Sequence, residues 1–264
     1  MRRLLCIGLI FIAYSLVQAH EFWLLPQKFR FNSGEKLLLD FMVGENFEGT
    51  YWDLNRHAVE KLSVHNRLSS ADLTAQVSKT SGKNLEYTFN NIGTHLFAME
   101  SNNAFLELEP AEFEAYLKED GLEYVIEERK SRGEAQTKSR ELYRRFAKLL
   151  VQVGDRTDDT YKKPTSQQLE IIPTKNPYDL RPGDYLQCKL YYRDHPEPHA
   201  LVKVWSHLGN RIFLQNIYTE SDGSITFPVS SRGPWMVSTV KMIRSDQPEA
   251  EWQSLWSSLV FEIN

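Results

Sequence analysis

Between residues 20 and 109, short apolar runs alternate with turn-forming residues, which is typical of β-strands. Leu85, Tyr87 and Phe89 share one face of an extended chain, and the residues between them are polar. Further apolar runs, separated by glycines, cover residues 36–43, 94–99 and 104–108. This spacing predicts an N-terminal β domain over residues 20–109, built as an antiparallel sandwich.

Residues 110–154 have a different period and are predicted to be helical. Pro110 suits the first position of a helix, and Phe113, Tyr116 and Leu117 follow at helical spacing. After Gly121, a second apolar stripe comprises Leu122, Val125 and Ile126. A third begins after position 138 and comprises Leu142, Phe146, Leu149, Leu150 and Val153. The opposite, basic face is interpreted as solvated and carries Arg140, Arg144, Arg145 and Lys148.

Strand patterns return in the last third of the chain. Residues 155–167 lack periodicity and are interpreted as a linker. Beyond them, six further strands are expected at residues 185–192, 201–205, 212–218, 225–229, 235–243 and 255–263. The sequence therefore predicts a mainly β protein with two immunoglobulin-like β-sandwich domains, the second over residues 168–264, and a helical segment between them. Its tryptophans are expected to anchor the cores.

The first 19 residues have the character of a secretory signal peptide. Arg2 and Arg3 precede a short apolar run, and Val17 and Ala19 supply the small residues that signal peptidase reads. Removal of 19 residues from 264 leaves 245 and changes the formal net charge from −4 to −6. Cys188 would then be the one remaining cysteine, so no intramolecular disulfide can form. We expect a periplasmic or secreted protein, and the acidic balance gives no support for nucleic-acid binding.

Cleavage after Ala19 would make His20 the first residue of the mature chain. Its α-amine and imidazole together form a bidentate chelate for nickel, copper or zinc. The alternative is that cleavage happened to fall before a histidine. The sequence has no nucleophile elbow, glycine-rich phosphate loop, HExxH motif or CxxC pair, which weakens common enzyme interpretations.

A metal held by His20 needs more ligands, because nickel and copper normally take four or more. The sequence predicts that at least one of His95, His199 and His207 completes the site. Each has an alternative: His95 lies in a strand and suits a packed core position, whereas His195 and His199 flank a proline-rich connection that suits a solvated loop. His57 and His65 have no distinguishing partner.

Several segments resemble one exported bacterial family of domains. They are HEFWLLP at 20–26, VGENF at 43–47, FEAYLKEDGLE at 113–123, SRELYRRFAK at 139–148, LEIIP at 169–173 and NPYDL at 176–180. Members of this family are associated, as periplasmic components, with nickel or cobalt transport systems. The resemblance spans nearly the whole mature chain and implies a β-rich exported protein, with His20 as a metal ligand. Where similar proteins often have His-Met, this chain has Lys241 and Met242.

Three functional hypotheses follow. The first is a non-enzymatic protein that binds nickel or cobalt, with copper or zinc as other possible ions, and presents it to an inner-membrane transporter. The second is an interaction module whose immunoglobulin-like domains bind a protein or glycan. The third is a copper enzyme with an N-terminal histidine. Metal binding by the processed protein separates the first from the second.

Overall fold

Four strands near the start of the chain form a small sheet, called the N-terminal sheet. The computed structural model describes residues 21–209 and 211–264. The strand order is β1-β3-β4, with β7 paired to β3. The strands are β1 (Glu21–Pro26), β3 (Lys36–Glu45), β4 (Glu48–Tyr51) and β7 (Leu85–Thr88).

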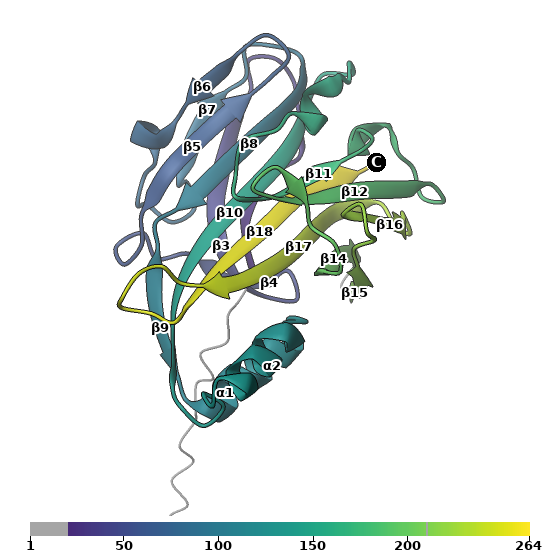
Figure 1. Ribbon diagram of the computed structural model, residues 1–264. Helices are drawn as coiled ribbons and strands as arrows, with labels where there is room; N and C mark the ends of the chain where they lie inside the picture. Colours follow the sequence, from purple (N-terminus) through teal and green to yellow (C-terminus); the bar gives the residue numbers. More distant parts are fainter. Residues whose placement is uncertain (1–20, 210) are drawn as a thin grey trace, which may run out of the picture.

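A ten-stranded central sheet runs through the whole molecule (Figure 1). Its order is β15-β14-β17-β18-β10-β8-β5-β6, and β2 and β9 also pair with β10. Its strands are β2 (Arg30–Phe31), β5 (Val59–His65), β6 (Ser70–Asp72), β8 (Gly93–Ser101), β9 (Ala104–Leu108), β10 (Ser139–Val153), β14 (Leu201–Leu208), β15 (Arg211–Tyr218), β17 (Gly233–Arg244) and β18 (Trp252–Ile263).

A third, C-terminal sheet has four strands. They are β11 (Leu169–Pro173), β12 (Tyr185–Tyr192), β13 (His195–Pro196) and β16 (Ser224–Pro228). Three single-turn 3₁₀ helices connect strands: η1 (Thr74–Gln76), η2 (Asp159–Lys162) and η3 (Pro177–Asp179). The protein is thus mainly β, with sheets packed face to face as predicted for a sandwich.

The two small sheets cover opposite faces of the central sheet. Side chains alternate along a strand, so Arg145 and Lys148 of β10 point to different faces. Arg145 lies over the ring of Phe22 in β1, at 5.4 Å, whereas Lys148 forms an ion pair with Glu170 in β11, at 2.9 Å. β10 is therefore covered by the N-terminal sheet on one side and by the C-terminal sheet on the other.

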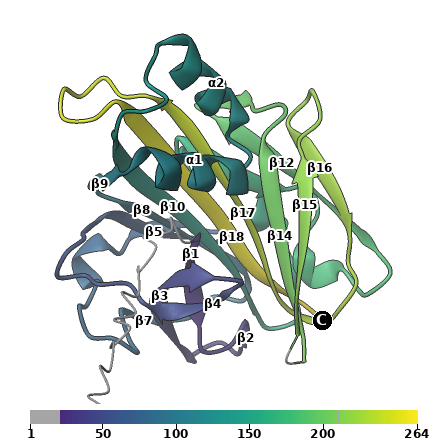
Figure 2. The same ribbon diagram turned by 90° about the horizontal axis from the view of Figure 1, so that it is seen from below.

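Two helices, α1 (Pro110–Glu119) and α2 (Glu123–Ser131), connect β9 to β10. Their apolar stripes pack on β17 and β18, forming a second core with Val240, Met242, Trp252 and Trp256. Figure 2 shows α1 lying across these two strands. Trp256 is paired with Arg145, so the helices occupy the same face of the central sheet as β1.

The helix predicted after position 138 is wrong. Residues 139–153 form β10, a strand of 15 residues that pairs in parallel with β18 and antiparallel with β8 and β9. Because both faces of β10 are covered, its apolar residues do not alternate, and their spacing imitates a helical stripe. The prediction of a solvated basic face is wrong for Arg145 and Lys148, which are buried, whereas Arg140 is exposed and Arg144 partly exposed.

The predicted linker is also packed rather than free. Thr165 donates from its backbone N–H to Glu170, and Gln167 donates from its side-chain amide to the carbonyl of Met99.

The tryptophans do anchor the cores as expected, since Trp23, Trp205, Trp235, Trp252 and Trp256 are all buried. No helix in the two described ranges combines the length and apolarity needed to cross a membrane.

Candidate functional site

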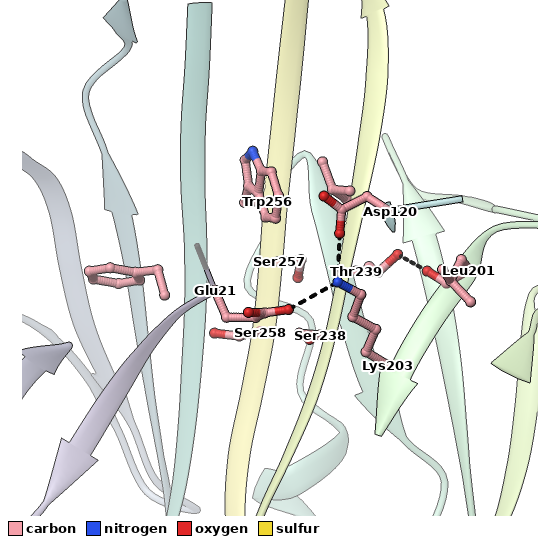
Figure 3. Close-up of a pocket in the computed structure, with 11 residues that line it drawn as sticks. Glu21, Asp120, Leu201, Lys203, Ser238, Thr239, Trp256, Ser257 and Ser258 are labelled. Carbon is pink, nitrogen blue, oxygen red and sulfur yellow. Dashed lines mark hydrogen bonds and ion pairs between the residues drawn. The ribbon is translucent and has the colours of Figure 1, made fainter. Parts of the chain in front are cut away.

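A buried ammonium group joins three distant parts of the chain. Lys203 of β14 lies 2.7 Å from Asp120 at the end of α1 and 3.3 Å from Glu21 at the start of β1. Figure 3 shows its nitrogen between the two carboxylates, and Trp256 lines the same cavity. The side chains of Glu21 and Asp120 are each 6% exposed. The cluster surrounds a cavity of about 10 Å³, which is room for about one water molecule.

Burial and charge oppose each other in this Lys203 cluster. Burial raises the pKa of Asp120 to about 7, although Lys203 opposes that rise. Burial acts to lower the pKa of Lys203, but Asp120 and Glu21 together outweigh it and leave that pKa raised. The lysine therefore stays charged. Its ion pair with Glu21 holds the first residue of β1 against the central sheet.

Trp256 also lines a larger hollow, called here the Glu141 pocket. Its volume is about 570 Å³, within the range of small-molecule sites. The walls come from residues 56–57, from residues 102–106, from three side chains of β10, and from Trp256 of β18. The side chains of β10 are Glu141, Tyr143 and Arg145.

Glu141 is the most deeply buried group of this pocket, at 1% exposure. Its Oε1 accepts hydrogen bonds from the hydroxyls of Tyr116, at 3.3 Å, and Ser254. Its Oε2 is buried without a hydrogen-bond partner among the described residues. Burial raises the pKa of Glu141 to about 7. The carboxyl group therefore keeps its proton to a higher pH than an exposed glutamate does.

Aromatic rings hold the other polar groups in place. The guanidinium of Arg145 lies over the rings of Tyr143 and Phe22, at 5.3 and 5.4 Å. The imidazole of His57 stacks on Trp52, with centroids 5.0 Å apart and planes 9° apart. Trp52 in turn contacts Phe22 edge-on at 5.0 Å. These contacts place His57 and Arg145 near the start of β1.

The histidine that carried the metal hypothesis, His20, lies outside the described residues. His95 is fully buried in β8, where its ring packs on Phe89 and its Nδ1 lies 3.3 Å from the carbonyl of Gly93. In the antiparallel pairing of β8 with β10, His95 lies opposite Val151. Because Val151 is six residues along β10 from Arg145, His95 is about 20 Å from the Glu141 pocket.

His199 and His207 lie apart from each other. His199 is exposed and precedes β14, whereas His207 packs edge-on against Phe47 near the other end of that strand. Six residues separate Leu201 from His207, a span of about 20 Å. Within residues 21–209 and 211–264, no group of three His, Cys, Asp or Glu side chains could hold a metal ion.

Lys241, at the position where the resemblance implies a histidine, forms an ion pair. Its ammonium pairs with Glu197 at 2.6 Å and lies 4.8 Å from the ring centroid of Tyr192. Glu197 belongs to the loop that carries His195 and His199. Lys241 thus ties this loop to β17.

Sequence reasoning missed most of the Glu141 pocket. Glu141 and Arg145 were placed on a predicted helix, where their common orientation on β10 could not be recognised. His57 carries no local signal, because its stacking on Trp52 and its position near β1 arise from the fold. Only an assignment of residues 139–153 as a strand would have grouped Glu141, Tyr143 and Arg145, which alternate at positions i, i+2 and i+4.

The structure defines a mainly β protein of the sandwich type, with a buried ionic cluster and a polar pocket where the start of β1 meets the central sheet. The chain belongs to a protein family known as a domain of unknown function, DUF4198, whose family model matches residues 17–242. No curated protein matches it.

Two solved structures are similar only in part. One is a tetra-tandem repeat in the extending region of a large adhesion protein, with 10% identity and a TM-score of 0.24, covering 93% of this chain and 50% of that one. The other is dimeric latent PorU from Porphyromonas gingivalis, with 11% identity and a TM-score of 0.21, covering 100% and 22%. The chain therefore spans half or less of either protein.

Proposed function

We propose that this protein is an exported, non-enzymatic metal-binding protein associated with nickel or cobalt uptake. It would act in the periplasm or outside the cell and present a divalent cation to an inner-membrane transporter. The resemblance of its segments to periplasmic components of such systems supports this role. So does the bidentate chelate that His20 would form after signal cleavage.

The observation that carries the proposal is the state of His57. Its Nδ1 is buried and has no hydrogen-bond partner among the described residues. Burial, helped by the charge of Arg145, lowers the pKa of His57, so the imidazole is neutral at physiological pH. A neutral, fixed imidazole with a free lone pair is a good ligand for a borderline divalent metal.

His57 also lies near the start of β1. Trp52 bridges the ring of His57 to the ring of Phe22, and Phe22 follows His20 by two residues. Two residues of extended chain span at most about 7 Å. We therefore propose that His57, rather than His95, His199 or His207, joins the amine and imidazole of His20. This site needs a single histidine from the described part of the chain.

Calorimetry with nickel and cobalt tests the proposal, with copper and zinc for comparison. The protein must begin at His20, as verified by N-terminal sequencing. We expect submillimolar binding or tighter, at least tenfold weaker in His57→Ala and in a chain extended by one residue before His20. His207→Ala is the matched control and should bind like the wild type.

Affinity should also fall as the pH approaches 6, where the amine and the His20 imidazole hold protons. Absence of any binding tighter than about millimolar would argue against a metal-binding role. Affinity that survives both the extension and His20→Ala would remove His20 from the site.

A further inference from the structure

We infer that the Glu141 pocket binds a small organic carboxylate that also carries a hydroxyl or amino group. This inference goes beyond the proposed metal binding and does not depend on it. It rests on the charge of the pocket, on an unpaired carboxyl oxygen and on the shape of the walls.

The charge of the pocket favours an anion. Arg56 lies exposed at its rim, and Arg145 lies buried within it. Both guanidinium groups remain charged at any physiological pH. Glu141 is the one acidic residue among the described lining. Guanidinium groups bind carboxylates with good geometry, so a carboxylate is the natural partner of this end of the pocket.

The unpaired oxygen of Glu141 selects what else the ligand must carry. Since Oε1 already accepts from Tyr116 and Ser254, Oε2 is the atom left for a ligand. A buried polar atom without a partner costs free energy, and a donor on the ligand would remove that cost. A hydroxyl or amino group supplies the donor. The sulfate dianion has no such donor.

The walls accommodate a molecule of modest size. Trp256, Tyr143 and Leu106 offer apolar surface, and Phe105 is 53% exposed at the mouth. Asn102 fixes the rim, because its side-chain Oδ1 accepts from the backbone N–H of Ala58 and its side-chain Nδ2 donates to the carbonyl of Asn103. The pocket is thus preformed, and a volume of about 570 Å³ suits an α-hydroxy or α-amino acid.

Calorimetry on protein stripped of metal by EDTA and then dialysed tests this inference. The probes are L-malate, citrate and L-glutamate, with succinate and sulfate as comparison anions. We expect at least one of the three probes to bind with a Kd below about 1 mM. Arg56→Ala, an exposed position, should weaken that binding at least tenfold. Arg67→Ala, which removes an exposed arginine outside the pocket, should leave it unchanged.

Glu141→Gln tests the donor, since glutamine keeps the acceptor for Tyr116 and Ser254 but presents an NH₂ group in place of one oxygen. The variant should lose the preference for L-malate over succinate, while circular dichroism confirms that it is folded. The inference is overturned if none of the three probes binds, if sulfate binds as tightly as they do, or if Arg56→Ala and Arg67→Ala behave alike. Because no metal is present, these outcomes leave the metal-binding proposal untouched.

Discussion

Lys148 and Glu170 form an ion pair that solvent hardly reaches, with side chains 1% and 3% exposed. Burial lowers the pKa of Lys148, and Glu170 counteracts this effect. The oxygen of Glu170 that faces Lys148 also accepts from the backbone N–H and the hydroxyl of Thr165. Removal of one partner from such a buried ion pair destabilises the folded state, because the other group is left buried without its counterion.

We therefore expect Lys148→Met to lower the free energy of unfolding by about 3–5 kcal/mol, because it removes the counterion of a buried carboxyl group. The double variant Lys148→Met/Glu170→Gln should recover a large part of that loss, since glutamine still accepts from Thr165. Urea denaturation measures both. Equal stabilities of the single and double variants would contradict the explanation.

Glu141 makes stability depend on pH. Burial raises its pKa from the ordinary 4.5 to about 7 in the folded state. Between these values the unfolded carboxyl group ionises while the folded one keeps its proton, so rising pH favours unfolding. The shift corresponds to about 3 kcal/mol, lost as the pH rises from about 4.5 to 7.

We expect Glu141→Gln to remove this contribution. The stability of the variant relative to the wild type should increase by about 3 kcal/mol between pH 4.5 and 7.5. Asp120, whose pKa burial also raises to about 7, contributes in the same range but is present in both proteins. Urea titrations at several pH values make the comparison. A constant difference across this range would show that Glu141 is not the group responsible.

At the level of elements, the end of α1 depends on one glycine. Gly121 has φ of +68°, and a Cβ there would lie 2.6 Å from the Cβ of Leu201 in β14. The helix can thus approach β14 closely enough for Asp120 to reach Lys203. The end of α2 provides a comparison, because Gly133 has φ of +72° with nothing within 4 Å of a Cβ.

We expect Gly133→Ala to cost about 1 kcal/mol, the penalty of its backbone conformation alone. Gly121→Ala should cost at least 1 kcal/mol more, because it adds a clash with Leu201 to the same penalty. Thermal and urea unfolding of the two variants give the difference. Equal losses would mean that the helix shifts freely from β14.

At the scale of the whole molecule, β10 joins the two halves. It pairs with β18 from Glu141 to Leu149, and it contacts both small sheets. One contiguous core includes Leu39 of the N-terminal sheet, Val237 of the central sheet and Leu186 of the C-terminal sheet. The central sheet packs against the N-terminal sheet on one face and the C-terminal sheet on the other, so the two resulting sandwiches share one core.

We therefore expect one cooperative unfolding transition, coincident by far-ultraviolet circular dichroism and tryptophan fluorescence. Residues 20–167 and residues 168–264, expressed separately, should not fold, because each loses one partner of the β10–β18 pair. Two resolved transitions, or a stable isolated half, would instead support two separate domains.

The sequence by itself determined the mainly β class and many of the strands, including residues 36–43, which begin β3, and residues 212–218 of β15. It also located α1 and α2 and assigned the tryptophans to the cores. The first helix shows why such a prediction succeeds. One face of α1 is covered, so its buried residues Phe113, Tyr116 and Leu117 recur at helical spacing in the sequence.

Only the tertiary structure decided that residues 139–153 form a strand, since covering both faces erases that period. It also decided the site. Glu21, Asp120 and Lys203 meet although about a hundred or about eighty residues separate them along the chain. His57 stacks on Trp52, and Trp52 contacts Phe22, although Phe22 is also distant from both in the sequence. A local pattern records whether a residue is covered, whereas the partner that covers it is set by how distant strands pair and pack.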